Sequence, residues 1–307
     1  MTGKNDIKEA LRDIVAGRIL YEEPMSGHTS LQVGGKADAL VLIDNKKQLA
    51  EVIGRLRARD IKFFVAGNLT NVIVRDGGYR GVILLMTGMK GIQCDYTPGG
   101  DYFLEAQAGA SLMRVVSRTV EEAMTGLEFC AGIPGSVGGA VWMNAGAYGK
   151  EMKDVIESVS VMTVDGDQRR MNRDEISFGY RQADFSGDVI ILGARFKLEK
   201  GDRDEMKKKI NDIMKSRQEK HPLDFPSAGS VFKNLPGMPA GKLIEEMGLK
   251  GTSAGGAQIS SKHGNFIVNK QMARASDVLS LIELIQSRAR KEKGVTLDTE
   301  VVIIGEN

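Results

Sequence analysis

The chain contains 307 residues, of which 42 are basic, 40 are acidic and 42% are hydrophobic, and its net charge is +2. This composition is typical of a globular protein of about two domains, and it excludes a largely disordered chain. So small a net charge also argues against nucleic acid as the main partner. Glycine supplies 37 residues, about 12% of the chain against roughly 7% in average proteins, which predicts many tight turns and close backbone approaches.

Several kinds of site are not supported by the residue spacing. Cys94 and Cys130 form neither a disulfide framework nor a metal-ligand spacing, so we expect two reduced, buried thiols. The three histidines are isolated from one another in the sequence, and no metal site is predicted. No apolar run approaches the roughly 20 residues of a membrane-spanning helix, and the N-terminal segment is unlike a secretory signal. We therefore expect a cytoplasmic protein without membrane association.

The first 90 residues predict a small α/β unit. Asn45 is placed to cap a helix whose apolar residues recur at helical spacing. Short apolar runs flank this helix, with a Gly-containing turn at 76–78. In chain order, the predicted elements are a helix at 5–16, a strand at 39–43, the helix that follows Asn45, and strands at 63–66, 72–74 and 82–86.

A second unit is predicted from residue 91 to residue 201. Ser111 is placed to cap a helix that Gly126 closes, and a long Gly-rich segment follows that helix. In chain order, the predicted elements are a strand at 102–106, the helix after Ser111, the Gly-rich segment at 130–149, and strands at 158–164 and 189–196.

The last third of the chain begins with a charged helix at 202–220, which marks the predicted domain boundary. Its lysines at 207–209 suggest either an anion site or a solvated helix face, and the solvated face is the preferred interpretation. A helix at 240–247, a strand at 266–268, a helix at 276–292 and a strand at 300–304 follow. We therefore expect three domains, at 1–90, 91–201 and 202–307.

Two Gly-rich segments carry the strongest chemical signal. The P-loop and the dinucleotide-binding GxGxxG after a strand are absent from the sequence, and the single GxSxG match, at 251–255, has no histidine placed near it to activate its serine. The segment 64–72 leaves one strand and enters another through small and amide residues, which suits an anion nest for a pyrophosphate, or an ordinary strand–turn–strand. The segment 131–140 has four glycines and one proline, so a planar ring or a phosphate can approach its backbone closely.

Three further clusters suggest roles in binding or catalysis. The Tyr180-Arg181 pair in FGYR can orient a carboxylate or phosphate through two parallel hydrogen bonds, or it can be a surface arginine. The segment 226–234 places the Ser230 hydroxyl between a glycine and an apolar residue. Glu300 opens an apolar strand, where it is either a solvated strand end or a buried carboxylate that needs a partner.

Together, these segments resemble the UDP-N-acetylenolpyruvoylglucosamine reductase (MurB) family over most of the chain, from His28 to Glu300. The resemblance departs from the family pattern at Leu69, where the family usually has a small residue, commonly Gly. The segment after FGYR runs directly into the strand at 189, as in the compact subtype of the family. The matching segments are HTSLQVGG, the GNLTN turn, GIPGSVGGAVWMNAGAYG, FGYR, SAGSVFKN, AGKLIEEMGLKG, GGAQIS, HGNFIVN and LDTEVVIIG.

The resemblance implies an α+β fold with an FAD-binding region of the FAD-linked oxidase (PCMH-like) type. This region consists of two α/β subdomains and is followed by a C-terminal α+β substrate domain. It also implies noncovalent FAD, NADPH as co-substrate, and a nucleotide-sugar substrate whose enolpyruvyl group is reduced in peptidoglycan precursor synthesis. The reaction has two half-reactions, in which a hydride passes from NADPH to the flavin and then to the substrate.

The resemblance assigns roles to individual residues. The implied catalytic residues are Arg181, which stabilises charge on the substrate, Ser230, which donates a proton, and Glu300, which assists at the carboxylate. The implied substrate-binding residues are Tyr180, Arg217, Lys233, Asn234 and Gln258, with Lys233 and Arg217 also candidates to support Ser230. The implied FAD-binding residues are Gly67, Asn68, Leu69, Thr70, Asn71, Gly132, Ile133, Pro134, Gly135, Ser136, Gly138, Gly139 and Ala145.

Two other functions remain open at this point. Another FAD-linked oxidase, acting on a sugar or hydroxy acid, would share the flavin loops but would not need both SAGSVFKN and LDTEVVIIG. A catalytically inert nucleotide-sugar binding protein would also carry Gly-rich loops, but it would be colourless after purification and flavin addition.

Overall fold

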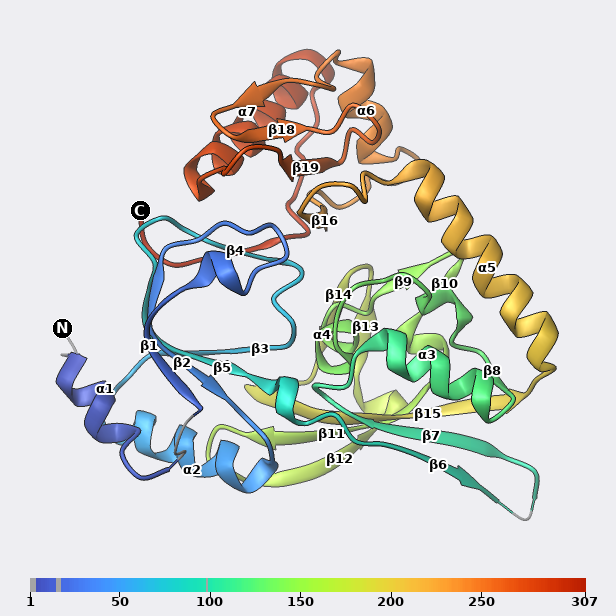
Figure 1. The fold of residues 1–307 in the computed structure, drawn as a ribbon. Coiled ribbons are helices and arrows are strands. Elements are labelled where there is room, and N and C mark those ends of the chain that lie inside the picture. Colours follow the sequence, from blue (N-terminus) through green and yellow to red (C-terminus); the bar gives the residue numbers. More distant parts are fainter. Residues whose placement is uncertain (1–3, 15–17, 98) are drawn as a thin grey trace. The chain divides into compact units, whose positions relative to one another are not determined.

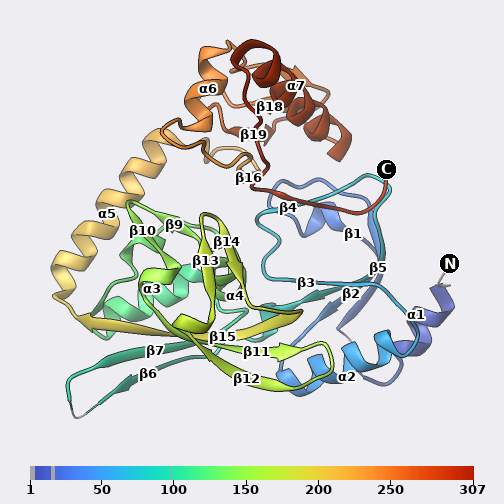
Figure 2. The same ribbon diagram turned by 180° about the vertical axis from the view of Figure 1, so that it is seen from behind.

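The computed structural model describes residues 4–14, 18–97 and 99–307. The chain forms two compact units, each built from segments that are far apart in the sequence. Figures 1 and 2 show the path of the chain from opposite sides. The larger unit comprises Met1–Leu20, Leu40–Asn68 and Gly81–Ser216, and the smaller unit comprises Tyr21–Ala39, Leu69–Arg80 and Arg217–Asn307.

The N-terminal sheet has four strands in the order β1-β2-β5-β3. Its strands are β1 (Ile19–Pro24), β2 (Lys36–Leu42), β3 (Phe63–Ala66) and β5 (Tyr79–Leu85). The helix α2 (Lys46–Arg57) lies between β2 and β3 in sequence and follows the short α1 (Lys4–Ala10). As predicted, the Asn45 side chain caps α2 by accepting a hydrogen bond from the Gln48 backbone N–H at 2.9 Å. The helix buries its apolar stripe, which consists of Leu49, Val52, Ile53 and Leu56.

The larger unit also contains an antiparallel sheet of six strands. Five strands follow the order β12-β11-β15-β7-β6, and β8 pairs with one end of β15. These strands are β6 (Ile92–Tyr96), β7 (Tyr102–Gln107), β8 (Met124–Thr125), β11 (Ile156–Thr163), β12 (Gln168–Asn172) and β15 (Val189–Lys200). The helices α3 (Leu112–Glu121) and α4 (Val137–Trp142) lie on one face of this sheet, as Figures 1 and 2 show.

Two short hairpins in the larger unit follow the Gly-rich segment. The first pairs β9 (Gly146–Ala147) with β10 (Lys150–Glu151), and the second pairs β13 (Ser177–Gly179) with β14 (Gln182–Asp184). The β13–β14 hairpin packs against α4. The turn of the second hairpin contains Tyr180 and Arg181, which were predicted to act in substrate binding and catalysis.

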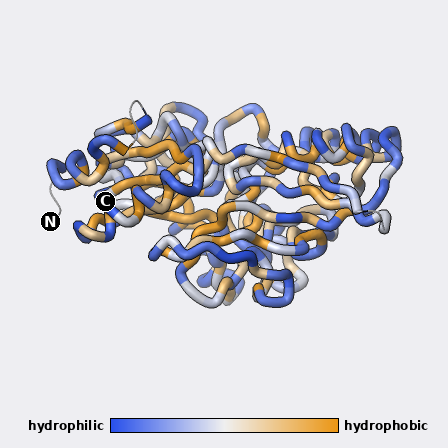
Figure 3. The backbone as a smooth tube through the Cα atoms, turned by 90° about the horizontal axis from the view of Figure 1, so that it is seen from below, coloured by the Kyte–Doolittle hydropathy of each residue, from blue (hydrophilic) through white to orange (hydrophobic). Residues whose placement is uncertain are grey.

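The helix α5 (Arg203–Lys220) is long and strongly charged. Met206 and Ile213 are its buried residues, whereas the lysines at 207–209 are exposed. Figure 3 accordingly colours most of this helix as hydrophilic. The preferred interpretation of a solvated helix face is confirmed.

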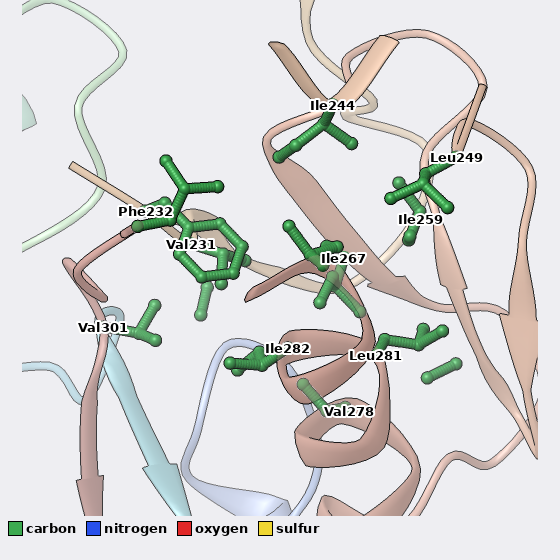
Figure 4. Packing of buried hydrophobic residues seen from close by; sticks show 14 of the residues in the cluster. Val231, Phe232, Ile244, Leu249, Ile259, Ile267, Val278, Leu281, Ile282 and Val301 are labelled. Carbon is green, nitrogen blue, oxygen red and sulfur yellow. The ribbon is translucent and has the colours of Figure 1, made fainter. Parts of the chain in front are cut away.

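The smaller unit is built around a four-stranded antiparallel sheet in the order β16-β19-β18-β17. Its strands are β16 (Ser227–Ser230), β17 (Ser253–Ala254), β18 (Ala257–Ile259) and β19 (Phe266–Asn269), and its helices are α6 (Ala240–Glu246) and α7 (Ala275–Lys293). A second pairing joins β20 (Val302–Ile304) to β4 (Val72–Val74) in parallel, although the two strands are more than two hundred residues apart. Figure 4 shows Val278, Leu281 and Ile282 of α7 in the same apolar cluster as Ile259 of β18 and Ile267 of β19.

The structure corrects two helix boundaries. The helix predicted at 5–16 ends at Ala10 and continues as a turn to residue 14, while residues 15 and 16 lie outside the described residues. The helix predicted to close at Gly126 ends at Glu121, because Ala123 already takes a left-handed backbone with φ +52°. The other predicted helices and strands are confirmed within a few residues of their ends.

Among the residues that the structure describes, no helix is long and apolar enough to cross a membrane. Over the same ranges, no group of three or more His, Cys, Asp or Glu side chains is arranged to hold a metal ion. Cys94 and Cys130 are both free thiols, but only Cys130 is buried as expected, because Cys94 lies on the edge strand β6 and is partly exposed.

Leu69, the residue that departs from the family pattern, has a left-handed backbone with φ +52°. This conformation disfavours side chains with a Cβ atom and favours glycine. The Leu69 side chain is nevertheless 3% exposed, so it packs inside the protein. Burial of the side chain therefore compensates for an unfavourable backbone at this position.

We expect Leu69→Gly to lower the free energy of unfolding by about 1–3 kcal/mol. Loss of a buried leucine side chain costs about 2–5 kcal/mol, and relief of the left-handed backbone offsets about 1–2 kcal/mol of that loss. Leu69→Ala removes the side chain without relieving the backbone, so it should be less stable than the Gly variant. Urea denaturation of the three purified proteins measures this order, and a Gly variant as stable as wild type would contradict it.

Candidate functional site

The larger unit brings the two Gly-rich segments together. Gly67 follows β3, and Ser136 immediately precedes α4. A Cβ atom added to Gly67 would lie 2.0 Å from the Ser136 hydroxyl oxygen, so any larger residue there requires this hydroxyl to move. Segments that are almost seventy residues apart in the sequence therefore form one surface, as the sequence predicts for a pyrophosphate site.

The second Gly-rich segment is held from behind by backbone hydrogen bonds. Gly135 accepts from the Leu112 N–H at 3.1 Å, and the Gly138 N–H donates to the Ala108 carbonyl at 2.8 Å. Gly138 lies so close to this support that a Cβ atom there would be 2.9 Å from the Ala108 Cβ. The opposite side of the segment remains accessible, because Gly132, Pro134 and Gly139 are exposed.

The Ser136 side chain provides a test of whether this surface suits an anionic cofactor. Its hydroxyl is buried, with the residue 2% exposed, and it has no hydrogen-bond partner among the described residues. Buried hydroxyl groups are almost always hydrogen-bonded, because desolvating an unpaired one is costly. An FAD phosphate oxygen approaching the glycine backbone would accept this hydrogen bond. The residues of both loops therefore fit the pyrophosphate of FAD.

Arg181 lies in the two-residue turn of the β13–β14 hairpin, after Tyr180. Its backbone is left-handed, with φ +56°. The guanidinium is 5.1 Å from the centre of the Tyr180 ring, and its Nη2 donates to the Gly146 carbonyl at 3.0 Å. Gly146 directly follows Ala145 within the Gly-rich segment 130–149, so the side chain of the predicted catalytic arginine is hydrogen-bonded to that segment.

A cavity of about 210 Å³ opens beside the Arg181 turn. It is lined by Trp142, Arg181, Gln182 and Phe185, among others. The Trp142 and Phe185 rings are stacked, with centroids 6.0 Å apart and an interplanar angle of 11°. The hairpin that carries Arg181 is therefore held to α4 partly by an aromatic contact, which sequence analysis did not predict.

The smaller unit places the predicted catalytic residues Ser230 and Glu300 on adjoining segments. Ser230 ends β16, and the Glu300 N–H donates to the carbonyl of the next residue, Val231, at 2.8 Å. The Asn71 amide then donates to the Glu300 carbonyl at 2.9 Å. Asn71, predicted as an FAD ligand, thus also fixes the backbone that carries Glu300.

The other predicted substrate-binding residues of this unit make different hydrogen bonds within the protein. The Asn234 Oδ1 accepts from the Ala240 N–H at 3.0 Å, which satisfies the first turn of α6. The Gln258 amide donates to the Gly251 carbonyl at 3.0 Å. Lys233 is tied through its backbone N–H to the Asp298 carbonyl at 2.9 Å, two residues before Glu300. Arg217 lies in the last turn of α5.

Two histidines lie close to β19, the strand that pairs with Ser230. The rings of His221 and His263 both contact Phe266, which is the cross-strand neighbour of Ser230. Burial lowers the pKa of His221 to about 4 and lowers the pKa of His263 below its ordinary value. Both rings are therefore neutral at pH 7, and neither supplies an imidazolium proton beside Ser230.

Sequence analysis did not single out Asn144 from the Gly-rich segment. Its side chain is fully buried and makes hydrogen bonds to the backbone of the β13–β14 hairpin. A polar amide within a run of small residues is the signal that marks such a position, because a buried amide must be satisfied by nearby backbone groups.

Two family comparisons cover most of the chain. Residues 221–304 match the family described as "UDP-N-acetylenolpyruvoylglucosamine reductase, C-terminal domain". Residues 37–172 match the family described as "FAD binding domain". A curated reductase of that name from Syntrophus aciditrophicus is 46% identical over 301 residues, which cover 98% of this chain and 96% of the relative.

The chain belongs to the UDP-N-acetylenolpyruvoylglucosamine reductase family. A reductase of this family from Geobacillus kaustophilus is 42% identical and aligns over the full length of both chains. The crystal structure of the reductase from Thermus caldophilus has a TM-score of 0.77 and 34% identity, covering 93% of this chain and 97% of that one.

A more distant structure supports the fold alone. A VAO-type flavoprotein from Myceliophthora thermophila has a TM-score of 0.52 at 10% identity, covering 65% of this chain and 48% of that chain. The α+β fold with an FAD-binding region of the FAD-linked oxidase type and a C-terminal domain, expected from the sequence, is confirmed.

We expect Gly135→Val to remove most of the flavin from the purified protein. Gly135 has φ +152°, and its carbonyl anchors the loop to Leu112, so a branched side chain would strain the backbone that approaches the cofactor. The flavin-to-protein absorbance ratio measures the loss. Gly54→Ala is the matched control, because a Cβ atom there meets nothing within 4 Å and the flavin ratio should stay unchanged. A Val variant with the wild-type ratio would contradict the placement of the pyrophosphate.

Proposed function

We propose that this chain reduces UDP-N-acetylglucosamine enolpyruvate to UDP-N-acetylmuramate, with FAD as its cofactor and NADPH as the co-substrate. Membership of the reductase family and the FAD-binding match support an FAD-dependent oxidoreductase of peptidoglycan precursor synthesis. The structural observation that carries the proposal is the buried, unpaired Ser136 hydroxyl beside the glycine backbone of both loops. The other oxidase and the inert binding protein are disfavoured, because the family match includes the C-terminal segments that those functions do not need.

The organisation and location of the protein form part of this proposal. We assign residues 1–90 and 91–201 to the two subdomains that bind FAD, and 202–307 to the substrate domain. Cys94 and Cys130 are both free thiols, which supports the proposal that the protein is located in the reducing cytoplasm. The nearly balanced charge favours a small nucleotide sugar over nucleic acid as the partner.

The residues of the Gly-rich loops bind and orient the cofactor. Ser136 and the backbone at 67–71 and 132–139 hold the pyrophosphate, and Ala145 continues this surface toward the Arg181 turn. When bound by these residues, FAD would supply the hydride transfer from NADPH to the terminal methylene carbon of the enolpyruvyl group. The protein's own groups must then stabilise the charge that develops and supply one proton.

Arg181 stabilises negative charge on the substrate. Addition of a hydride to the methylene carbon leaves an electron pair on the adjacent carbon, and this charge spreads into the carboxylate. A guanidinium donates two parallel hydrogen bonds to a carboxylate and therefore stabilises the charge where it develops. Glu300 assists at the same carboxylate, and Tyr180 helps to position the substrate beside Arg181.

Ser230 donates the proton to the carbon that carries the electron pair. The C–H bond forms with the hydroxyl proton, and the serine oxygen takes the negative charge until solvent returns a proton to it. Lys233 and Arg217 are the cations that we assign to stabilise this oxygen. Neutral His221 and His263 support this assignment, because neither offers an imidazolium at pH 7. Asn234 and Gln258 complete the proposed set of substrate-binding residues.

The flavin spectrum of the holoenzyme tests the whole proposal. A yellow preparation should be bleached by NADPH alone and should recover its colour when the enolpyruvyl substrate is added without oxygen. A colourless protein after flavin addition would support the inert binding protein. Recovery of colour with oxygen but not with substrate would support another oxidase.

We expect Arg181→Ala to slow reoxidation by substrate about 10²–10³-fold, the typical loss when one charge-stabilising group is removed. Bleaching by NADPH should change far less, because no substrate carboxylate takes part in it. Stopped-flow absorbance separates the two half-reactions. Arg181→Lys keeps the charge without the paired hydrogen bonds and should recover part of the rate. An equal loss in both half-reactions would assign Arg181 to folding or to binding that both steps share.

We expect Ser230→Ala to slow reoxidation by about 10²–10⁴-fold, the usual contribution of general acid catalysis. Flavin content, thermal stability and bleaching by NADPH should stay close to wild type. Ser230→Cys supplies a more acidic group and should restore part of the rate. Ser227→Ala is the matched control on the same strand, β16, and should behave as wild type. Reoxidation of the Ser230→Ala variant at the wild-type rate would remove Ser230 from the mechanism.

A further inference from the structure

Asn144 connects the end of the Gly-rich segment to the hairpin that carries Arg181. Its Nδ2 donates to the Gly179 carbonyl at 2.9 Å and to the Glu151 carboxylate at 3.1 Å. Its Oδ1 accepts from the Lys153 N–H at 3.0 Å. Asn144 itself is 0% exposed, whereas its partners are only partly buried or exposed, so its buried amide depends on these three hydrogen bonds.

The hydrogen bond to Gly179 acts on the turn that contains Arg181. Gly179 pairs with Gln182 at the end of the hairpin, so the two residues between them form the turn. Arg181 keeps its left-handed backbone, with φ +56°, only where its surroundings hold the turn. Asn144 fixes the start of this turn, and Gly146, two residues beyond Asn144, accepts from the Arg181 guanidinium.

We propose that Asn144 is a positioning residue that holds the β13–β14 turn so that the Arg181 guanidinium meets the carboxylate of the substrate. This inference rests on the proposed function of Arg181. Asn144 acts through the Gly179 carbonyl, and no contact with the substrate is assigned to it.

Asparagine suits this position better than other residues. Its backbone is also left-handed, with φ +39°, a conformation that Asn and Asp tolerate better than most residues. Only an amide supplies both donors for Gly179 and Glu151 and an acceptor for Lys153. Aspartate keeps the shape, the backbone preference and the acceptor, but it places an oxygen against two acceptors. Asn144→Asp therefore removes the two donated hydrogen bonds with the least change in the shape of the side chain.

We expect Asn144→Asp to slow reoxidation of the holoenzyme by substrate about 10²-fold, because a small misplacement of a catalytic group has an effect of this size. Bleaching by NADPH should stay within about twofold of wild type, because it does not depend on Arg181 meeting the carboxylate. Thr119→Val is the control for loss of a buried hydrogen bond elsewhere, since Thr119 is 0% exposed and bonds only within α3. It should lower thermal stability without slowing either half-reaction.

A double variant separates positioning from stability. In Asn144→Asp combined with Glu151→Gln, the Gln amide donates to the Asp carboxylate and restores the contact between these two side chains, while the ion pair of Glu151 with Lys153, at 2.6 Å, is lost. The Gly179 carbonyl still lacks its donor. Thermal stability should therefore recover toward wild type while reoxidation stays slow. Glu151→Gln alone loses the same partly exposed ion pair, so it is the reference for the thermal stability of the double variant, and its reoxidation should be close to wild type.

Trp142 provides a readout that does not depend on activity. It is the single tryptophan of the chain, and it stacks on Phe185, which follows β14. A shift of the hairpin should change its emission and its quenching by acrylamide. We expect this change in Asn144→Asp and in the double variant, and not in Glu151→Gln.

Two results would overturn the inference. One is an Asn144→Asp variant with wild-type reoxidation and tryptophan emission. The other is a double variant in which stability and reoxidation recover together, which would make the role of Asn144 structural only. If wild type itself is not reoxidised by the enolpyruvyl substrate, the proposed function is wrong, and the Trp142 signal alone decides whether Asn144 holds the hairpin.

Discussion

The contact between Gly67 and Ser136 is the constraint on which the functional surface of the larger unit depends. The serine hydroxyl lies 2.0 Å from the position that a Cβ atom on Gly67 would take, so a larger residue there would displace it. That hydroxyl is buried and has no partner among the described residues, so it favours an incoming acceptor. One contact thus sets both the spacing of the two loops and the chemistry of the surface they form.

The two units fix their functional residues through backbone groups rather than through long side-chain networks. In the larger unit, Asn144 and Gly146 hold the turn around Arg181. In the smaller unit, the Val231 carbonyl and the Asn71 amide hold the segment that begins at Glu300. Backbone anchors of this kind limit the conformational freedom of the residues that they hold.

Three of the eleven described non-glycine residues with a left-handed backbone bear on the site or on the departure from the family pattern. Leu69, Asn144 and Arg181 all have positive φ without being glycine. Asparagine tolerates this conformation, whereas leucine and arginine adopt it only because burial or neighbouring hydrogen bonds compensate. The departure of Leu69 from the family pattern is therefore accommodated by packing of its side chain, which is almost fully buried.

The sequence by itself determined the local elements and the order of the chemical motifs. Asn45 and Ser111 cap the helices that follow them, and the apolar spacing of α2 and α7 sets their buried faces, because these signals act within a few residues. The tertiary structure alone decided which distant segments meet. β4 pairs with β20, Gly67 meets Ser136, and Asn144 reaches Gly179, and no local pattern encodes these contacts. Edge strands such as the charged β12 were likewise not predicted, since their pairing depends on a neighbour supplied by the fold.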